Sequence, residues 1–126
     1  MYSITVKDHF DSAHYIRDYQ GKCSRQHGHT WYIDLVLTSG RLHALNMLVD
    51  FAAVKTHLKK ILDKLDHYQL NEVLAEPNVT AEYLSKWIYD NFKNPWIGDG
   101  VNLDSVTIWE SPNCGVKYSK CPIQNK

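Results

Sequence analysis

The sequence predicts an α+β fold in which a four-stranded antiparallel sheet carries two helices on one face. Residues typical of strands gather toward both ends of the chain, and apolar residues at helical spacing occupy its middle. Turns that contain Gly or Pro separate these segments. A chain of 126 residues is large enough for its own core, so we expect a single domain over residues 1–126.

Two strands are expected in the first third of the chain. Residues 2–10 are rich in β-branched and aromatic side chains, which favours a strand. Residues 15–26 are expected to form a loop, in which Gly21 marks a turn. Residues 29–38 form the second predicted strand, and a Ser-Gly pair follows it.

Two helices are predicted in the middle of the chain. Asp50 is a suitable N-cap for a helix over residues 51–65, and a second helix is expected over residues 80–92. The apolar residues that share one face of the first helix are Val54, Leu58, Ile61, Leu62 and Leu65. The residues that share one face of the second are Ala81, Leu84, Trp87, Ile88 and Asn91.

The chain is predicted to end in an antiparallel hairpin. Residues 101–111 and 115–119 are the expected strands, with a turn over residues 112–115. A small sheet of this kind has exposed edges, and long edge strands are covered, charged or paired with another chain. We therefore expect the protein to form homo-oligomers by continuing its sheet.

Composition excludes several classes of protein. Lys plus Arg equals Asp plus Glu at 14 each, so no basic excess indicates nucleic-acid binding. No apolar run approaches the length of a membrane span, and no signal peptide is visible. The three cysteines are an odd number without paired spacing, which favours a reducing cytoplasm over a disulfide framework.

A cluster of histidines and one cysteine indicates a metal site. His14 precedes the run Cys23-Ser-Arg-Gln-His27-Gly-His29. If the second strand begins at His27, then His27 and His29 project from one face, and His14 supplies a third imidazole. Catalytic zinc commonly has three protein ligands and one open position, although nitrogen ligands also suit iron, copper or nickel. The alternative is that His-Gly-His is a polar strand edge.

Cys23 lies in a polar loop beside Lys22 and Arg25. Neighbouring cations and a metal favour the thiolate, which is the reactive form. The thiol is thus a candidate nucleophile, general base or fourth metal ligand, and the alternative is an incidental free cysteine. Cys114 and Cys121 have no histidine or carboxylate at ligand spacing and are interpreted as bystanders.

The pair Asp66-His67 follows the first predicted helix. A carboxylate can orient an imidazole, and the imidazole can exchange a proton with a thiol. Adjacent residues need not touch through their side chains, however. A pair at a helix end, with the histidine favoured by the helix dipole, is an equal alternative.

Glu110 shares a strand face with Val106 and Ile108 by the two-residue period of a strand. A carboxylate on an apolar face is costly without a partner. The ring edge of a pterin or a guanine offers two parallel N–H donors that a carboxylate accepts. The alternative is a glutamate at the end of a strand that reaches water.

Taken together, these fragments resemble the 6-pyruvoyltetrahydropterin synthase family over nearly the whole chain. The resemblance is to the branch that makes 6-carboxy-5,6,7,8-tetrahydropterin for queuosine biosynthesis, in which the gap between the corresponding cysteine and histidine is also three residues long. The matching segments are Phe10-Asp-Ser-Ala-His14, Cys23-x-x-x-His27-Gly-His29, Leu48-Val-Asp50-Phe51, Leu65-Asp66-His67-x-x-Leu70-Asn71, Thr80-Ala-Glu82 and Trp109-Glu110-Ser111.

The resemblance implies roles for particular residues. Zinc ligation is implied for His14, His27 and His29, and acid–base catalysis for Cys23 with Asp66 and His67 as its partners. Glu110 is implied to anchor the pterin ring, and Thr80 and Glu82 to lie near the pterin pocket. Tyr68 and Val79 depart from the family pattern, where a histidine and a proline are usual; we expect them to affect only the pocket wall.

The resemblance also implies a reaction and an assembly. The implied substrate is 7,8-dihydroneopterin triphosphate, from which a zinc-dependent lyase makes 6-carboxy-5,6,7,8-tetrahydropterin with release of acetaldehyde and triphosphate. The implied fold is the tunnelling fold, whose subunits join their sheets into a barrel as trimers or hexamers with active sites at subunit interfaces. The alternatives are a pyruvoyl-tetrahydropterin synthase, another pterin lyase on the same scaffold, and a non-catalytic zinc or pterin binding module.

Overall fold

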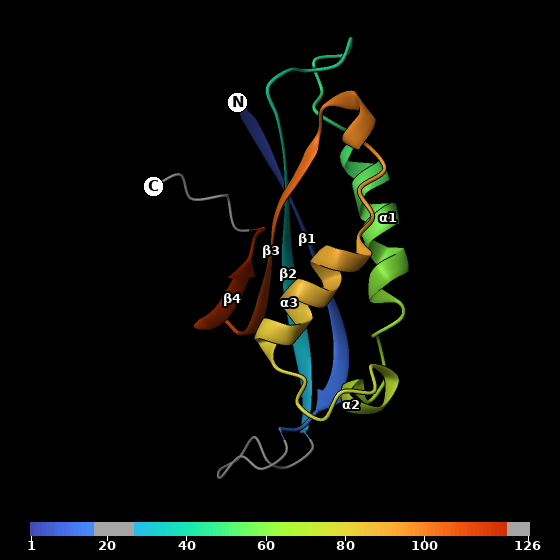
Figure 1. The fold of residues 1–126 in the computed structure, drawn as a ribbon, viewed down its shortest axis with the longest axis vertical. Helices are drawn as coiled ribbons and strands as arrows, with labels where there is room; N and C mark the ends of the chain where they lie inside the picture. The colour runs from blue at the N-terminus through green and yellow to red at the C-terminus, as the bar shows by residue number, and fades with distance from the viewer. Residues whose placement is uncertain (17–26, 121–126) are drawn as a thin grey trace.

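A computed structural model describes residues 1–16 and 27–120 and contains an antiparallel sheet of four strands in the order β1-β2-β3-β4. The strands are β1 (Tyr2–His14), β2 (His27–Ser39), β3 (Asn102–Ser111) and β4 (Cys114–Tyr118). The helices are α1 (Phe51–Leu62), α2 (Leu70–Val73), α3 (Ala81–Asn91) and the short 3₁₀ helix η2 (Ile97–Asp99). Helices α1 and α3 lie against the same side of the sheet, which confirms the predicted α+β class (Figure 1).

The core lies between that face of the sheet and the helices. Alternate residues of β2 point into it: Trp31, Ile33 and Leu35 are fully buried, whereas Tyr32 is 52% exposed. The predicted apolar face of α1 is buried in full, including Leu65 beyond the helix end. The buried residues of α3 are Ala81, Leu84, Ser85 and Ile88. The inward-facing residues of the sheet and the apolar faces of the two helices therefore pack together in one apolar layer.

Strands β1 and β2 are longer than the sequence predicted. The first strand continues past Phe10 to His14, and the second begins at His27 and not at His29. Residues 11, 12 and 14 carry polar side chains that do not favour a strand, but residues 11–14 pair with residues 27–30 in an unbroken ladder. The tertiary pairing therefore outweighs local propensity, and it pairs His14 with His27, the residues on the two sides of the predicted loop.

Helix α1 is shorter than predicted because the chain turns after Leu62. The N–H groups of Leu65 and Asp66 both donate to the carbonyl oxygen of Leu62, at 2.9 Å each. The turn buries Leu65 and carries the next residues to the sheet. Two short helices, α2 with its N-cap at Gln69 and η2, were not predicted. The bounds of β3 and β4 differ from the prediction by one residue.

The free edge of β1 is covered near its C-terminal end. The N–H of His67 donates to the carbonyl oxygen of Asp11 at 2.6 Å, and the N–H of Ala13 donates to that of Tyr68 at 3.2 Å. Ala13 and Gln69 form an isolated parallel bridge. The segment 66–69 therefore occupies part of the edge that the sequence left open, which limits sheet continuation at this end of β1.

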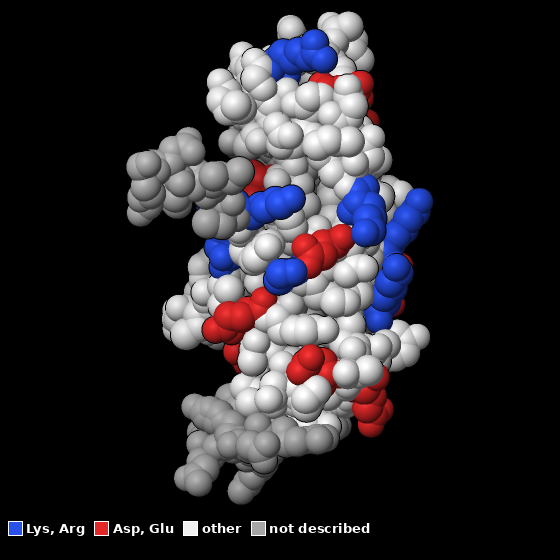
Figure 2. Space-filling model, in the orientation of Figure 1, with Lys and Arg blue, Asp and Glu red and all other residues white. Residues whose placement is uncertain are grey.

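Charged side chains of both signs are interspersed over the face seen in Figure 2, with basic residues along α1. This distribution agrees with the zero formal net charge of the chain. Within residues 1–16 and 27–120, no helix combines the length and apolar character that a membrane crossing requires.

Gly115 of β4 is expected to be intolerant of a side chain. A Cβ atom there would lie 2.6 Å from Trp109 Cε3, so the indole of β3 would have to move. We expect Gly115→Ala to lower the free energy of unfolding by about 1–3 kcal/mol through overpacking. Gly98→Ala is the control, since no atom lies within 4 Å of its added Cβ. Urea unfolding of both variants tests this, and equal midpoints for the two would contradict it.

Candidate metal and substrate site

Adjacent strands bring two of the predicted histidines together. His14 ends β1 and His29 lies near the start of β2, in a register that pairs His14 with His27 and Ser12 with His29. The rings of His14 and His29 have centroids 5.0 Å apart. Both rings contact Trp31, at 4.9 and 5.3 Å between centroids. The indole therefore forms an apolar floor under the two imidazoles.

The orientation of His14 is set by a backbone carbonyl. Its ring is 1% exposed, and Nδ1 lies 2.8 Å from the carbonyl oxygen of Val79. Because a carbonyl oxygen only accepts, Nδ1 carries the proton and donates, and Nε2 is the basic nitrogen. This is how a metal-binding imidazole is commonly held. Val79 was expected to affect only the pocket wall; the expectation was too narrow, because its backbone orients a candidate ligand.

Glu110 of β3 approaches both imidazoles. Its Oε1 lies 3.5 Å from His14 Nε2 and 3.4 Å from His29 Nε2, and its side chain is 32% exposed. The carboxylate therefore points toward the histidines and not simply into water. The predicted common face of Glu110 with Val106 and Ile108 accounts for this, because both of these residues are fully buried toward the helices.

The donor set fits a metal ion. One ligand atom from each of His14, His29 and Glu110 lies within 4.8 Å of the other two, so a single ion can contact all three. A tetrahedral zinc with bonds of about 2.0–2.1 Å places neighbouring ligand atoms about 3.3–3.4 Å apart. The separations of 3.4 and 3.5 Å to Glu110 match that spacing. The arrangement thus offers imidazole and carboxylate ligands of the kinds that zinc binds.

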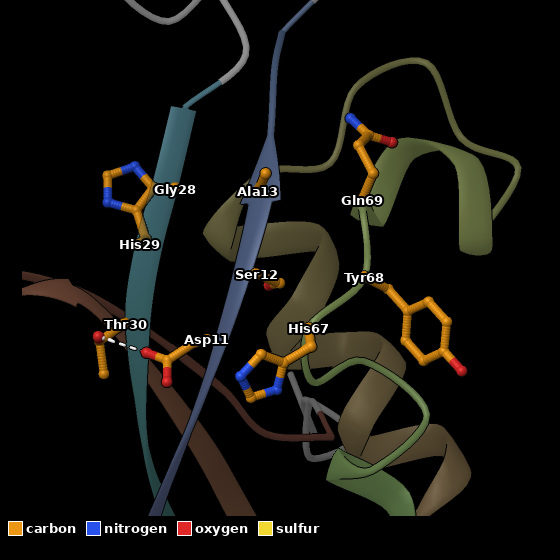
Figure 3. A pocket seen from close by; sticks show the side chains of 9 residues that line it. All are labelled: Asp11, Ser12, Ala13, Gly28, His29, Thr30, His67, Tyr68 and Gln69. Carbon is orange, nitrogen blue, oxygen red and sulfur yellow. Dashed lines mark hydrogen bonds between the residues drawn. The ribbon is translucent and has the colours of Figure 1, made fainter.

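A pocket of about 580 Å³ opens beside this group (Figure 3). It lies where β1, β2 and the segment 66–69 meet. The residues that line it are Asp11, Ser12, Ala13, Gly28, His29, Thr30, His67, Tyr68 and Gln69. A volume of this size is in the range of small-molecule sites. His29 belongs to both the pocket wall and the candidate metal group, so the pocket adjoins that group.

Asp66 and His67 contact each other through their side chains. His67 Nδ1 lies 3.0 Å from Asp66 Oδ2, so the structure has the direct contact that the sequence left open. His67 has a φ of 62°, in the left-handed region that a residue with a Cβ adopts at a cost. Its side chain is 79% exposed and lines the pocket. The carboxylate therefore orients an imidazole that faces the pocket.

The Asp66 carboxylate is stabilised in its charged form. The backbone N–H of Asp11 donates to its Oδ1 at 2.9 Å, and this hydrogen bond, with a smaller contribution from His67, holds the pKa of Asp66 below its ordinary value of 3.8. A lowered pKa in the folded state means that the stabilisation is complete above the unfolded value and is lost as the pH falls through the folded value.

Asp66→Asn is accordingly expected to have a pH-dependent effect on stability. The variant should be less stable than the parent at neutral pH, and the difference should close as the pH falls below 3.8, where the parent carboxylate takes up a proton. Urea unfolding at several pH values measures the difference. Asp63→Asn, at an exposed position near the end of α1, is the control. A difference that stays constant with pH would contradict the prediction.

Of the remaining predicted site residues, some lie outside the described part of the chain and others lie away from the pocket lining. Cys23 and the side chain of His27 lie outside the described residues, although the backbone of His27 pairs with His14. Thr80 is the N-cap of α3 and accepts from the N–H of Tyr83, whereas Glu82 is exposed in the first turn. Among the described residues, the structure does not place Thr80 or Glu82 in the lining of the 580 Å³ pocket.

Sequence reasoning missed the role of Asn71. Its side chain accepts from the N–H of Tyr15 at 2.9 Å and donates to the carbonyl oxygens of Tyr15, Glu76 and Pro77. This buried amide fastens the end of β1 to the loop that carries Val79. A buried asparagine is costly unless its polar atoms form hydrogen bonds, and those of Asn71 do. In the sequence, the available indication of this structural role was the position of Asn71 in the Leu70-Asn71 motif.

Comparisons with known proteins find relatives that match most of the chain. The sequence model of the family described as 6-pyruvoyl tetrahydropterin synthase matches residues 3–121. The chain is 30% identical over 123 residues to a 6-carboxy-5,6,7,8-tetrahydropterin synthase of Synechocystis, covering 94% of this chain and 93% of that protein. It is 28% identical to a dihydroneopterin monophosphate aldolase of Pyrococcus furiosus, covering 90% of this chain and 94% of that protein.

The structure is also similar to that of a 6-pyruvoyl tetrahydropterin synthase of Caenorhabditis elegans. The TM-score is 0.80 at 24% identity, with 95% of this chain and 96% of the other covered. Fold and site thus define an α+β protein of the tunnelling-fold class with a histidine-rich candidate metal group. The chain belongs to the 6-pyruvoyl tetrahydropterin synthase family, as its motifs indicated.

Proposed function

We propose that this protein is a zinc-dependent lyase that converts 7,8-dihydroneopterin triphosphate to 6-carboxy-5,6,7,8-tetrahydropterin, releasing acetaldehyde and triphosphate, in queuosine biosynthesis. The observation that carries the proposal is the convergence of His14, His29 and Glu110 beside a pocket that also holds His67. The relative in Synechocystis whose name states this product supports the choice of reaction.

The proposed metal ligands are His14, His27 and His29. Bound zinc would supply Lewis-acid polarisation of the substrate's side-chain oxygens. The chain prepares two of these ligands: the Val79 carbonyl fixes the tautomer of His14, and Trp31 supports the rings of His14 and His29. An apolar floor of this kind limits solvent at the ligands and keeps the imidazoles in place.

The proposed proton-transfer groups are Cys23 and His67. His67 presents its imidazole to the pocket, and Asp66 holds Nδ1 at 3.0 Å, so the other ring nitrogen is directed to exchange protons. Cys23 precedes β2 in the chain, and a thiolate there would move protons along the pterin side chain. Dividing acid and base roles between a thiol and an imidazole suits a reaction that needs several proton transfers.

Glu110 is proposed to anchor the pterin ring, but its contacts make zinc ligation the competing role. Glu110→Gln separates the two roles. Loss of a hydrogen bond to a charged group costs about 1.5–3 kcal/mol, so an anchor predicts that KM rises about 10- to 100-fold with zinc affinity unchanged. Zinc affinity measured by chelator competition gives the second readout. A fall in zinc affinity without a change in KM would assign Glu110 to the metal.

Product analysis tests the proposed reaction. The zinc-loaded protein is incubated with dihydroneopterin triphosphate, and the pterin product is identified by mass spectrometry. We expect the 6-carboxy product together with acetaldehyde. Cys23→Ala should abolish turnover, and Cys114→Ala, at a free exposed cysteine, is the matched control. The absence of any pterin product from the loaded parent would overturn the lyase proposal and leave a binding module.

A second candidate reaction follows from the aldolase of Pyrococcus furiosus, which covers most of this chain at 28% identity. An aldolase would release glycolaldehyde from a dihydroneopterin substrate, whereas a pyruvoyl-tetrahydropterin synthase would retain the three-carbon side chain. The mass of the pterin product therefore separates all three reactions in one measurement.

We also propose that the protein acts in the cytoplasm as a homo-oligomer, a trimer or a hexamer, with active sites at subunit interfaces. Strands β1 and β4 lie at the two edges of the sheet, which supports assembly by sheet continuation. The open side of the 580 Å³ pocket leaves room for residues of a second subunit. A monomeric mass in light scattering at micromolar protein would overturn the assembly.

A further inference from the structure

Asp11 lies between the two chain segments that frame the pocket. On one side it pairs with Thr30 of β2, and on the other its backbone holds the segment 66–69. The Asp11 N–H donates to Asp66 Oδ1 at 2.9 Å, and the Asp11 carbonyl oxygen accepts from the N–H of His67 at 2.6 Å. One residue of β1 therefore fixes both members of the Asp66-His67 pair.

The hydrogen bond to the Asp11 carbonyl has a particular consequence for His67. Its φ of 62° is unfavourable for a residue with a Cβ, and such a conformation persists only where the surroundings determine it. The short bond from His67 N–H to β1 supplies that constraint at the backbone. Asp66 contacts the ring at Nδ1, but a side chain that is 79% exposed still has room to leave the pocket, so a second contact would restrict it further.

The side chain of Asp11 is in place to supply this second constraint. Its Oδ1 accepts from Thr30 Oγ1 at 2.5 Å, which fixes the carboxylate against β2. One ligand atom from each of Asp11, Asp66 and His67 lies within 4.8 Å of the other two. Figure 3 shows the Asp11 carboxylate between Thr30 and the His67 imidazole. The imidazole of His67 therefore has two carboxylate neighbours: Asp66, which it contacts, and Asp11 of β1, which lies nearby.

We propose that Asp11, held by Thr30, is a positioning residue that keeps the imidazole of His67 turned into the pocket. This inference rests on the proposed function of His67 in proton transfer. Asp66 contacts Nδ1 and fixes one end of the ring, while the Asp11 carboxylate lies within 4.8 Å of a ring nitrogen and restricts movement of the ring on the β1 side. Restricting the ring to one rotamer raises the fraction of molecules in which it can reach a bound substrate.

The competing interpretation is that Asp11 and Thr30 are an ordinary cross-strand pair that stabilises the sheet. The chain offers a matched control for that interpretation. Lys7 and Asp34 are another directly paired couple on β1 and β2, joined by an ion pair of 2.8 Å away from the pocket. Lys7→Met therefore removes a cross-strand contact of the same two strands without touching the site.

The kinetic test uses Asp11→Ala, Asp11→Glu, Thr30→Val and the double variant Asp11→Ala/Thr30→Val. Acid–base catalysis contributes roughly 10²–10⁴-fold, so we expect loss of a positioning residue to lower kcat about 10-fold with KM little changed. Thr30→Val should lower kcat in the same direction, and the double variant should be no worse than Asp11→Ala, because Thr30 acts through Asp11. Asp11→Glu, which restores a carboxylate, should recover part of kcat. Lys7→Met should leave kcat unchanged.

A second readout is independent of turnover. NMR couplings that report χ1 of His67 should show one dominant rotamer in the parent protein and averaged rotamers in Asp11→Ala, with the exposed His9 and His43 as internal references. If the parent makes no pterin product, the proposed function fails, yet these couplings still decide the role of Asp11. Unchanged χ1 couplings in Asp11→Ala, or a kcat equal to that of Lys7→Met, would overturn the proposal.

Discussion

Trp31→Ala is expected to lower the free energy of unfolding by about 3–5 kcal/mol, the range for removing a buried aromatic side chain. Trp31 is fully buried and stacks on Phe10 with ring centroids 6.3 Å apart. Its ring also contacts His14 and His29 edge-on. The loss therefore combines a cavity in the core with the loss of aromatic contacts beneath the candidate metal group.

Urea unfolding followed by far-ultraviolet circular dichroism measures this loss. Tyr32→Ala is the matched control, because Tyr32 is the next residue of β2, points to the opposite face and is 52% exposed. We expect the control to lose less than about 1 kcal/mol, as is usual for an exposed site. Trp31→Phe should fall between the two. A Trp31→Ala protein as stable as Tyr32→Ala would contradict the assignment of the core.

His29→Ala is expected to abolish high-affinity zinc binding and, with it, turnover. Loss of partners that only orient a ligand costs roughly 10- to 100-fold in metal affinity, so loss of a ligand itself should cost more than about 100-fold. His29 Nε2 lies 3.4 Å from Glu110 Oε1 and His29 lines the pocket, so its removal would alter both the candidate metal group and the pocket wall. Chelator competition gives the zinc affinity, and product formation gives the activity.

His9→Ala is the control for this experiment. His9 is an exposed histidine of β1 whose ring packs against Tyr32 on the opposite face of the sheet. His9→Ala should leave zinc affinity and turnover unchanged. It should change the free energy of unfolding by a few tenths of a kcal/mol, within the about ±0.5 kcal/mol usual for surface substitutions. Zinc affinity retained in His29→Ala would remove His29 from the set of ligands and, with it, the proposed metal centre.

Much of the fold followed from sequence periods. The helical spacing predicted the apolar face of α1, and the structure buries all of it. This prediction succeeded because apolar residues at helical spacing form one face, and burial of that face is favourable. Element ends were less predictable: β1 continues to His14 because pairing with β2 compensates for polar residues of low strand propensity.

The candidate site was predictable in its residue types and less so in its contacts. The motifs identified His14, His29, Asp66, His67 and Glu110 as chemically important. Their mutual distances depend on strand register and on the turn after α1, and neither can be read from spacing. Asp11 shows the limit most clearly, because its importance comes from neighbours 19 and 55 residues away in sequence.

The sequence by itself determined the α+β class, the apolar faces and the set of histidine, cysteine and carboxylate residues suited to metal and acid–base chemistry. Only the tertiary structure decided that Glu110 approaches His14 and His29, that Val79 orients His14 and that Asp11 holds the Asp66-His67 pair. The physical reason is that the spacing of apolar residues along the chain indicates which face of an element is buried. Hydrogen bonds and metal coordination, in contrast, require atoms from distant segments to be placed within a few tenths of an ångström. That placement arises where β1, β2, β3 and the segment 66–69 meet.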